Sequence, residues 1–269
     1  MSPNANTLTP TRALRLACGL GAAVGALLAV LMLAPARWVG DALSLASGQR
    51  WILTHTQGSW WRGSGQLLLS GGAGSRTAMR VPGGLNWEIA PSWSGLVARL
   101  NAPCCTPQGL ELRIQPSLGL QGWGLRVQLM DQPSTWPAQL LAGLGTPWNT
   151  LQLSGPLQLS SQSLALNITP HARHLAGTLT LQATALSSQL TTIRPMGSYA
   201  LTLQGGDVPR LSLSTSHGPL KLEGQGQWVG DKLRFNGQAT AEPAQEAELA
   251  NLLNIMGRRT GARSLITLG

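Results

Sequence analysis

The stretch from residue 151 to residue 168, LQLSGPLQLSSQSLALNI, decides the fold. Leucine alternates with Gln or Ser on both sides of the pair Gly155-Pro156, so an apolar side chain recurs at every second position. Successive side chains of a strand point to opposite faces, so this period of two predicts strands with one covered face and one wet face. Because Gly-Pro is a turn signal, the two runs are expected to be neighbouring antiparallel strands.

The same alternation continues on both sides of this stretch. It is found in GQLLLSGG at 65–72, GTLTLQAT at 177–184, YALTLQGG at 199–206 and RLSLSTS at 210–216. Glycine- and proline-rich turn signals separate the runs, which is typical of hairpins joined in sequence. We predict an all-β fold, in which an antiparallel meander forms a sandwich or a curled sheet.

Residues 16–34, LACGLGAAVGALLAVLMLA, contain no charged side chain. At about 1.5 Å per residue, a helix of this length approaches the ~30 Å hydrocarbon core of a bilayer. A basic tail precedes the segment, and Trp38 after it suits the membrane interface. We therefore expect four parts: a cytoplasmic tail at 1–15, a transmembrane helix at 16–34, a juxtamembrane linker at 35–45 and an exported β-domain at 46–269.

A cleaved signal peptide is the alternative to this anchor, because Ala34-Pro35-Ala36 imitates an A-x-A cleavage site. Proline is unfavourable in such a site, and the apolar segment exceeds the usual signal-peptide core, so the anchor is favoured. In both cases the remainder of the chain leaves the cytoplasm. Within the anchor, Gly21 and Gly25 have the four-residue spacing that allows a close helix–helix contact in the membrane.

Helices are expected at few places outside the anchor. The strongest pattern is Glu242–Met256, with Pro243 in the first turn and acidic residues at the positive helix end. Its apolar residues follow helical spacing and form one face: Leu249, Leu252, Leu253 and Met256. We interpret this helix as a lid over one end of the β-domain, with a partner-docking helix as the alternative. Shorter helices are expected at 38–46 and 136–144, and a last strand at 264–268.

The sequence offers little for catalysis. It has ten Asp and Glu and four His, which are scattered. His171 and His174 form the closest His pair, but no Cys or Glu cluster joins them, so we interpret them as a solvated loop pair rather than a metal site. No nucleophile elbow, P-loop or dinucleotide fingerprint is present. We predict no catalytic residue, cofactor, metal or small-molecule substrate.

The net charge of +9 comes from basic residues that are spread singly along the chain. A nucleic-acid groove needs clustered basic residues with interleaved aromatics, so we predict no nucleic-acid partner.

The cysteines and tryptophans are the remaining candidates for special roles. Cys104 and Cys105 are adjacent, and an oxidising compartment permits a disulfide between them, with a pair of half-buried thiols as the alternative. Phe and Tyr occur once each against ten Trp, so most Trp are expected to fill the core. The candidates for either a partner surface or the core include Trp60, Trp61 and Trp228, and also Trp87, Trp93, Trp123 and Trp148.

Several segments, taken in order, resemble protein N of the bacterial type II (general) secretion pathway. They are APARWVGDALSLASG at 34–48, GSWWRGSGQLLLSGG at 58–72, GQWVGDKLRFNGQATAEP at 226–243 and EAELANLLNIMGRRTGARSLITLG at 246–269. Between residues 100 and 200 the likeness is mostly one of architecture. The resemblance implies an accessory, non-catalytic subunit in the inner membrane of a Gram-negative bacterium, with its bulk in the periplasm. Its implied partners are the C, L and M proteins of the inner-membrane platform.

Two other functions compete with this adaptor role. A curled sheet with Leu on its concave side suits a periplasmic lipid-binding or lipid-transfer module with an apolar groove, although the same pattern describes an ordinary core. An envelope hydrolase is disfavoured by the sparse carboxylates and His.

Overall fold

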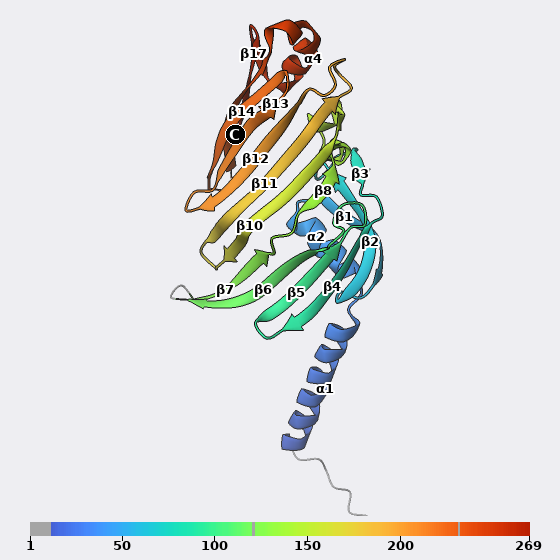
Figure 1. Cartoon of the computed structure of the whole chain (residues 1–269). Coiled ribbons are helices and arrows are strands. Elements are labelled where there is room, and N and C mark those ends of the chain that lie inside the picture. Colours follow the sequence, from blue (N-terminus) through green and yellow to red (C-terminus); the bar gives the residue numbers. More distant parts are fainter. Residues whose placement is uncertain (1–11, 120–121, 231) are drawn as a thin grey trace, which may run out of the picture.

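The computed structural model describes residues 12–119, 122–230 and 232–269 of the chain (Figure 1). An N-terminal helix precedes a long, curled antiparallel sheet, and short helices pack near the two ends of that sheet. The helices are α1 (Arg12–Leu33), α2 (Arg37–Ala46), α3 (Trp148–Leu151) and α4 (Glu246–Met256), with 3₁₀ turns η1 (Ala138–Leu144) and η2 (Pro243–Gln245).

The described part of the chain contains seventeen strands in one sheet. In the first half they are β1 (Trp51–Gly58), β2 (Arg62–Ser70), β3 (Ala78–Arg80), β4 (Leu85–Ser92), β5 (Gly95–Asn101), β6 (Leu110–Gly119), β7 (Gly122–Leu129), β8 (Ser134–Pro137) and β9 (Leu153–Ser154). In the second half they are β10 (Pro156–Ile168), β11 (Arg173–Ser188), β12 (Gly197–Gly206), β13 (Arg210–His217), β14 (Leu220–Val229), β15 (Lys232–Ala241), β16 (Arg258–Thr260) and β17 (Arg263–Leu268).

The pairings make one continuous path across the sheet. It runs from β1 through β2, β4, β5, β6 and β7 to β10, and then through β11 to β15, β17 and β16. The short strands β3 and β8 pair beside the long strands β2 and β10. The expectation that the runs on both sides of Gly155-Pro156 are neighbouring strands is wrong, because Trp148–Leu151 form α3 and the two-residue strand β9 pairs with β11. Every pair is antiparallel, as the alternation predicts, and of the two expected architectures the curled sheet is the one observed (Figure 1).

Register explains why one face is apolar. Residues directly opposite on neighbouring strands share a face, and Leu159, Leu181, Leu201 and Leu213 form one such row on β10 to β13. The residues between them belong to the other face, where Thr180, Thr202, Ser212, Gln225 and Asn236 are opposite one another. The sheet thus has an apolar face and a hydroxyl- and amide-bearing face.

The larger core lies where α4 covers the apolar face of the second half. Leu249, Leu252 and Leu253 are fully buried, and they belong to the same cluster as Leu157 and Tyr199 of the sheet. Met256 packs against this cluster and is partly buried. The apolar face predicted for this helix is therefore confirmed, and α4 is a lid on the sheet.

The smaller core lies under α2 in the first half. Leu53 and Leu67 face each other on β1 and β2, and Trp87 of β4 is buried in the same cluster. An added Cβ at Gly40 would stand 3.3 Å from the Leu53 Cβ atom, so glycine lets α2 lie close to β1. Both cores are thus formed by a helix that covers one end of the apolar face.

The boundaries of the helices differ slightly from those expected. The helix expected at 136–144 is a 3₁₀ turn over Ala138–Leu144, because residues 134–137 are taken by strand β8. The C-terminal helix begins at Glu246 rather than Glu242, and Pro243 starts a separate 3₁₀ turn before it. Proline is tolerated there because the first N–H groups of a helix have no intrahelical partner.

The predicted membrane segment coincides with most of α1, and residues 1–11 of the predicted cytoplasmic tail lie outside the described residues. Within the described chain, no helix reaches the combination of length and hydropathy required to cross a membrane. Helix α1 ends at Leu33, and residues 34–36 attach to the sheet. Ala36 N donates to Gly58 O at 3.1 Å, and Trp60 N donates to Ala34 O at 3.1 Å.

Candidate interaction surfaces

The predicted His pair lies at the turn between β10 and β11. His171 and His174 are both exposed, and His174 Nε2 is 3.7 Å from Asp207 Oδ1, across the sheet at the next turn. In the part of the chain that the structure describes, no three His, Cys, Asp or Glu side chains gather in a way that would hold a metal ion. The arrangement is that of a solvated surface contact.

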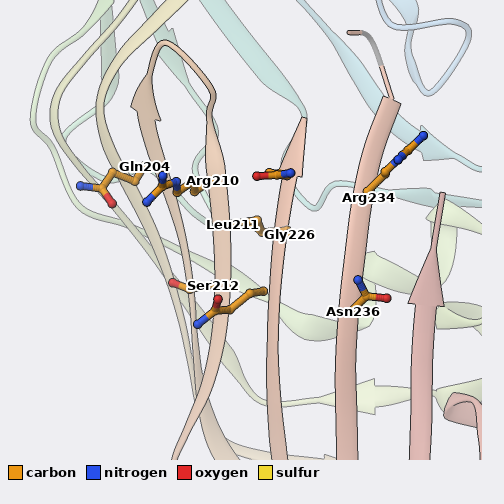
Figure 2. A pocket seen from close by; sticks show the side chains of 9 residues that line it. Gln204, Arg210, Leu211, Ser212, Gly226, Arg234 and Asn236 are labelled. Carbon is orange, nitrogen blue, oxygen red and sulfur yellow. The ribbon is translucent and has the colours of Figure 1, made fainter. Parts of the chain in front are cut away.

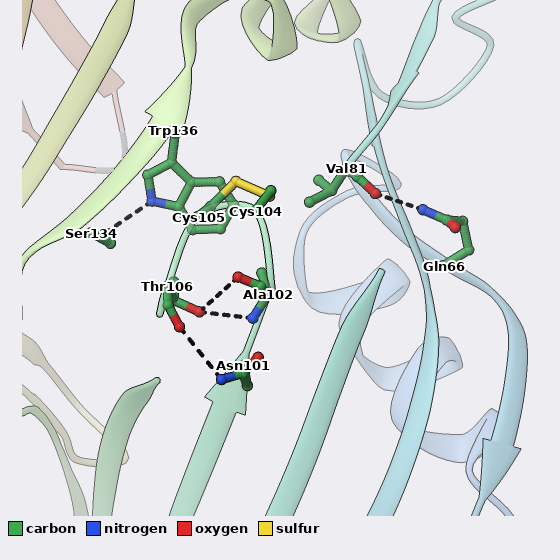
Figure 3. Close-up of a disulfide and its surroundings, with 9 residues drawn as sticks. All are labelled: Gln66, Val81, Asn101, Ala102, Cys104, Cys105, Thr106, Ser134 and Trp136. Atoms are coloured by element: carbon green, nitrogen blue, oxygen red, sulfur yellow. Dashed lines mark hydrogen bonds between the residues drawn. A yellow bond between two sulfur atoms is a disulfide. The ribbon is translucent and has the colours of Figure 1, made fainter. Parts of the chain in front are cut away.

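Cys104 and Cys105 form a disulfide in the turn between β5 and β6 (Figure 3). Thr106 fixes this turn, because its Oγ1 accepts a hydrogen bond from Ala102 N at 2.7 Å. Cys105 is fully buried in the smaller core, and Trp136 packs against that core beside the disulfide. The disulfide therefore lies at the inner side of a packed turn, whereas Cys104 is exposed.

Trp60 and Trp61 lie in the turn between β1 and β2. Their ring centroids are 3.7 Å apart, and Trp60 O accepts a hydrogen bond from the Trp87 indole Nε1 at 3.2 Å. Both side chains are partly buried. The Trp60 carbonyl thus ties this turn, to which residues 34–36 also attach, to the buried Trp87.

The other predicted anchor and partner residues are spread apart. Trp228 is partly buried on β14, and Trp38 is half exposed on α2. Gly21 and Gly25 lie on α1, where an added Cβ would meet nothing within 4 Å. The structure thus brings Trp60 and Trp61 together but leaves Trp38, Trp228 and the two glycines on separate elements.

Three of the tryptophans that were candidates for either the core or a partner surface are on the surface. Trp93, between β4 and β5, is fully exposed at 108%, and Trp123 at the start of β7 is 72% exposed. Trp148 is also exposed, whereas Trp87 is buried in the smaller core. A signal for Trp93 was present, because Pro91, Ser92, Ser94 and Gly95 around it are turn-forming residues.

A shallow depression of about 510 Å³ lies on the polar face of β12 to β15 (Figure 2). Arg210 and Arg234 lie on either side of Gln227, which is opposite both of them. The remaining lining is also mostly polar: Gln204, Ser212, Gln225 and Asn236, with Leu211 and Gly226 at its floor. A second depression, between residues 189–194 and α4, is likewise lined mainly by polar side chains.

Two side chains of the sheet have shifted pKa values. The hydrogen bond from the Arg62 guanidinium, together with its charge, lowers the pKa of the exposed Glu88 carboxyl on the neighbouring strand. Burial raises the pKa of Tyr199, whose hydroxyl donates to Leu220 O at 3.1 Å. The two shifts thus have local causes, an ion pair with Arg62 for Glu88 and burial for Tyr199.

Comparison with known proteins identifies the family. The family described as type II secretion system (T2SS), protein N, matches residues 49–265, from just before β1 into β17. No curated protein and no solved structure matches the chain. The match covers well over half of the chain, so this chain belongs to the protein N family of the type II secretion system.

Proposed function

We propose that this chain is a non-catalytic adaptor of the inner-membrane platform in type II secretion. The observation that carries the proposal is the family match over residues 49–265. The accessory role in type II secretion belongs to the family, whereas direct contacts with the C, L and M platform proteins are the proposal. An adaptor needs surface rather than a reaction centre, and the long sheet supplies two faces and several exposed turns.

The proposal includes an inner-membrane location, with the N-terminus in the cytoplasm and the β-domain in the periplasm. It is supported by the apolar side chains that α1 leaves exposed: Leu20, Val24, Val30, Met32 and Leu33. Such side chains are costly in water and favourable in lipid. The absence of neighbours at Gly21 and Gly25 leaves that side of α1 open to another helix.

The lipid-binding alternative is less well supported. Its groove would be formed by apolar side chains on the concave face, but both described depressions are lined mainly by polar groups. The crosslinking experiment below distinguishes the lipid-binding module from the adaptor.

In-cell crosslinking followed by mass spectrometry tests the adaptor. Intact cells that make the tagged chain are crosslinked, and the proteins and lipids that copurify are identified. We expect the C, L or M platform proteins, and bait peptides that retain residues before Ala34. A double variant, Gly21→Leu with Gly25→Leu, should reduce this recovery several-fold, since leucine prevents close approach of another helix.

The matched control is Ala23→Leu, which adds a similar side chain to a different side of α1. Recovery of copurified lipid without platform proteins would replace the adaptor with the lipid module. A mature bait whose own N-terminus lies after residue 36, with no peptide recovered from the residues before it, would contradict the anchor.

A further inference from the structure

The turn between β4 and β5 presents a tryptophan that the turn itself does not need. Ser92 and Gly95 are opposite each other, so Trp93 and Ser94 are the two residues of the loop. The loop is fixed by other groups: Ser94 Oγ accepts a hydrogen bond from Gln115 Nε2 of β6 at 2.8 Å. Gly95, with a φ of 150°, lies against the backbone of Ile114 where a Cβ would not fit. Trp93 is left fully exposed at the tip of a well-fixed hairpin.

The neighbouring hairpin repeats this feature. Trp123 follows directly on Gly122 at the start of β7, and it too is mostly exposed. Because Leu96 is opposite Ile114, and β6 continues beyond that point to its turn into β7, the two hairpins end on the same side of the sheet. Two adjacent hairpins therefore each carry an exposed indole at the same end of the strands.

Helix α1 leaves the sheet on that side as well. Residues 34–36 are bonded to Gly58 and Trp60, next to Arg62, which is opposite Glu88 of β4. From Glu88, β4 runs on to its tip at Trp93, so the attachment of α1 and this tip are at the same end of the strands. In Figure 1, α1 extends downward from the lower part of the sheet, the β4–β5 hairpin ends at the lower left, and the β6–β7 hairpin ends at the left.

The chemistry of these tips matches that of a bilayer surface. An indole has an apolar body and one N–H donor, and tryptophan is enriched where hydrocarbon meets the headgroups. The chain as a whole carries a charge of +9. Cationic groups beside interfacial apolar groups favour anionic lipid headgroups.

We propose that the hairpin tips carrying Trp93 and Trp123 insert into the headgroup region of the bilayer that holds α1, and so set the sheet at a fixed tilt on an anionic membrane surface. The inference rests on the membrane anchoring proposed for α1. Because α1 and the two hairpin tips all contact the membrane, the domain is held against it and is not free to rotate about residues 34–36.

Site-specific fluorescence on the full chain tests this contact. In a Cys18→Ser background, Trp93→Cys and Trp123→Cys are each labelled with the environment-sensitive dye NBD, without reducing agent so that the Cys104–Cys105 disulfide does not react. The chains are reconstituted into vesicles of phosphatidylethanolamine and phosphatidylglycerol. We expect blue-shifted emission and several-fold stronger quenching by headgroup-region spin-labelled lipid than for Trp148→Cys. The control Trp148 is also exposed, but it lies beyond the opposite end of β10.

The outcomes separate this inference from the function on which it rests. A label at Val24→Cys reports α1 alone, because lipid that is spin-labelled deep on its acyl chain quenches this dye only if α1 enters the hydrocarbon core. If this dye is quenched while the dyes at 93 and 123 match the dye at 148, the anchor stands and the tip contact is refuted. If the dyes at 93 and 123 become shielded only when platform proteins are added, these tips bind protein and the lipid proposal is overturned. If platform proteins are not recovered after crosslinking, but spin-labelled lipid still quenches the dyes at 93 and 123, the adaptor is refuted and the tip contact stands.

Discussion

At the scale of single residues, glycines make room for two buried aromatic rings of the sheet, Phe235 and Trp87. Phe235 lies over Gly224, Gly226 and Gly237 on the apolar face, where an added Cβ at any of them would crowd the ring. Trp87 covers Gly63 in the same way on β2 and β4. Phe235 and Trp87 are therefore buried against positions that carry no side chain.

The first prediction follows from this close fit. Gly224→Ala should destabilise the domain by about 1–3 kcal/mol, because the new Cβ overlaps the Phe235 ring and the buried ring has to move. Gln225→Ala, one residue later on the polar face, should change stability by about 0.5 kcal/mol or less. Chemical denaturation of both variants measures the difference, and equal effects would show that the ring is free to adjust.

The second prediction concerns the single tyrosine. Tyr199→Phe removes the buried hydrogen bond to Leu220 O and should cost about 1 kcal/mol at neutral pH. The raised pKa means that the folded state keeps the Tyr199 proton at pH values where the unfolded chain loses it. This contribution is therefore complete below the ordinary tyrosine pKa of about 10 and is lost as the pH rises above it.

Denaturation curves at neutral and at alkaline pH test this account. The wild-type chain should lose more stability than the Phe variant between the two conditions. An equal loss in both proteins would mean that Tyr199 titrates normally in the folded state.

At the scale of elements, α4 illustrates what the sequence predicts well. Its apolar stripe follows the helical period, and all of those residues are buried or partly buried under the lid. The boundary was less accurate, since Pro243 begins a separate 3₁₀ turn. Periodicity reports which face is covered, whereas the first residue of a helix depends on local hydrogen bonds that leave little trace in the pattern.

The third prediction compares two sides of this lid. Leu253→Asp should cost several kcal/mol, on the order of 3 or more, because a carboxylate would be placed in a fully buried apolar site. Ile255→Asp, at a position that is 37% exposed on the same helix, should cost about 1 kcal/mol or less. Thermal unfolding of the two variants gives the comparison.

A Leu253→Asp chain that unfolds at the wild-type temperature but loses a partner would contradict the lid and make α4 a docking helix.

The hairpin turns show what the sequence predicts less well. The count of Phe and Tyr favours a core role for most Trp, yet Trp93 and Trp123 are exposed at two adjacent hairpins. Composition gives the average role of a residue type, whereas exposure depends on its position along a strand. The turn-forming neighbours of Trp93 carried that information, and Trp123 has a similar signal in Gly122.

At the scale of the whole molecule, the alternation of leucines was sufficient to predict an antiparallel sheet with one apolar face. It was not sufficient to choose between a sandwich and a curled sheet, because both bury one face of each strand. The structure has a single curled sheet with a helix covering each end of its apolar face. The candidate contacts were less predictable, since they depend on which turns end on the same side as α1.

The fourth prediction is that secretion depends on this chain as a subunit of the export machinery. A strain that lacks the chain should retain type II cargo in the periplasm, and the full chain should restore export. The Leu253→Asp variant should fail to restore it because the domain is unstable, whereas Ile255→Asp should restore it as the matched control.

A role in type II secretion is therefore decided by measuring how a folded type II cargo is divided between periplasm and medium in these strains. The account predicts a several-fold lower secreted fraction without the chain and recovery on complementation, while periplasmic proteins that are not cargo stay in place. An unchanged secreted fraction in the strain that lacks the chain would contradict a role in type II secretion.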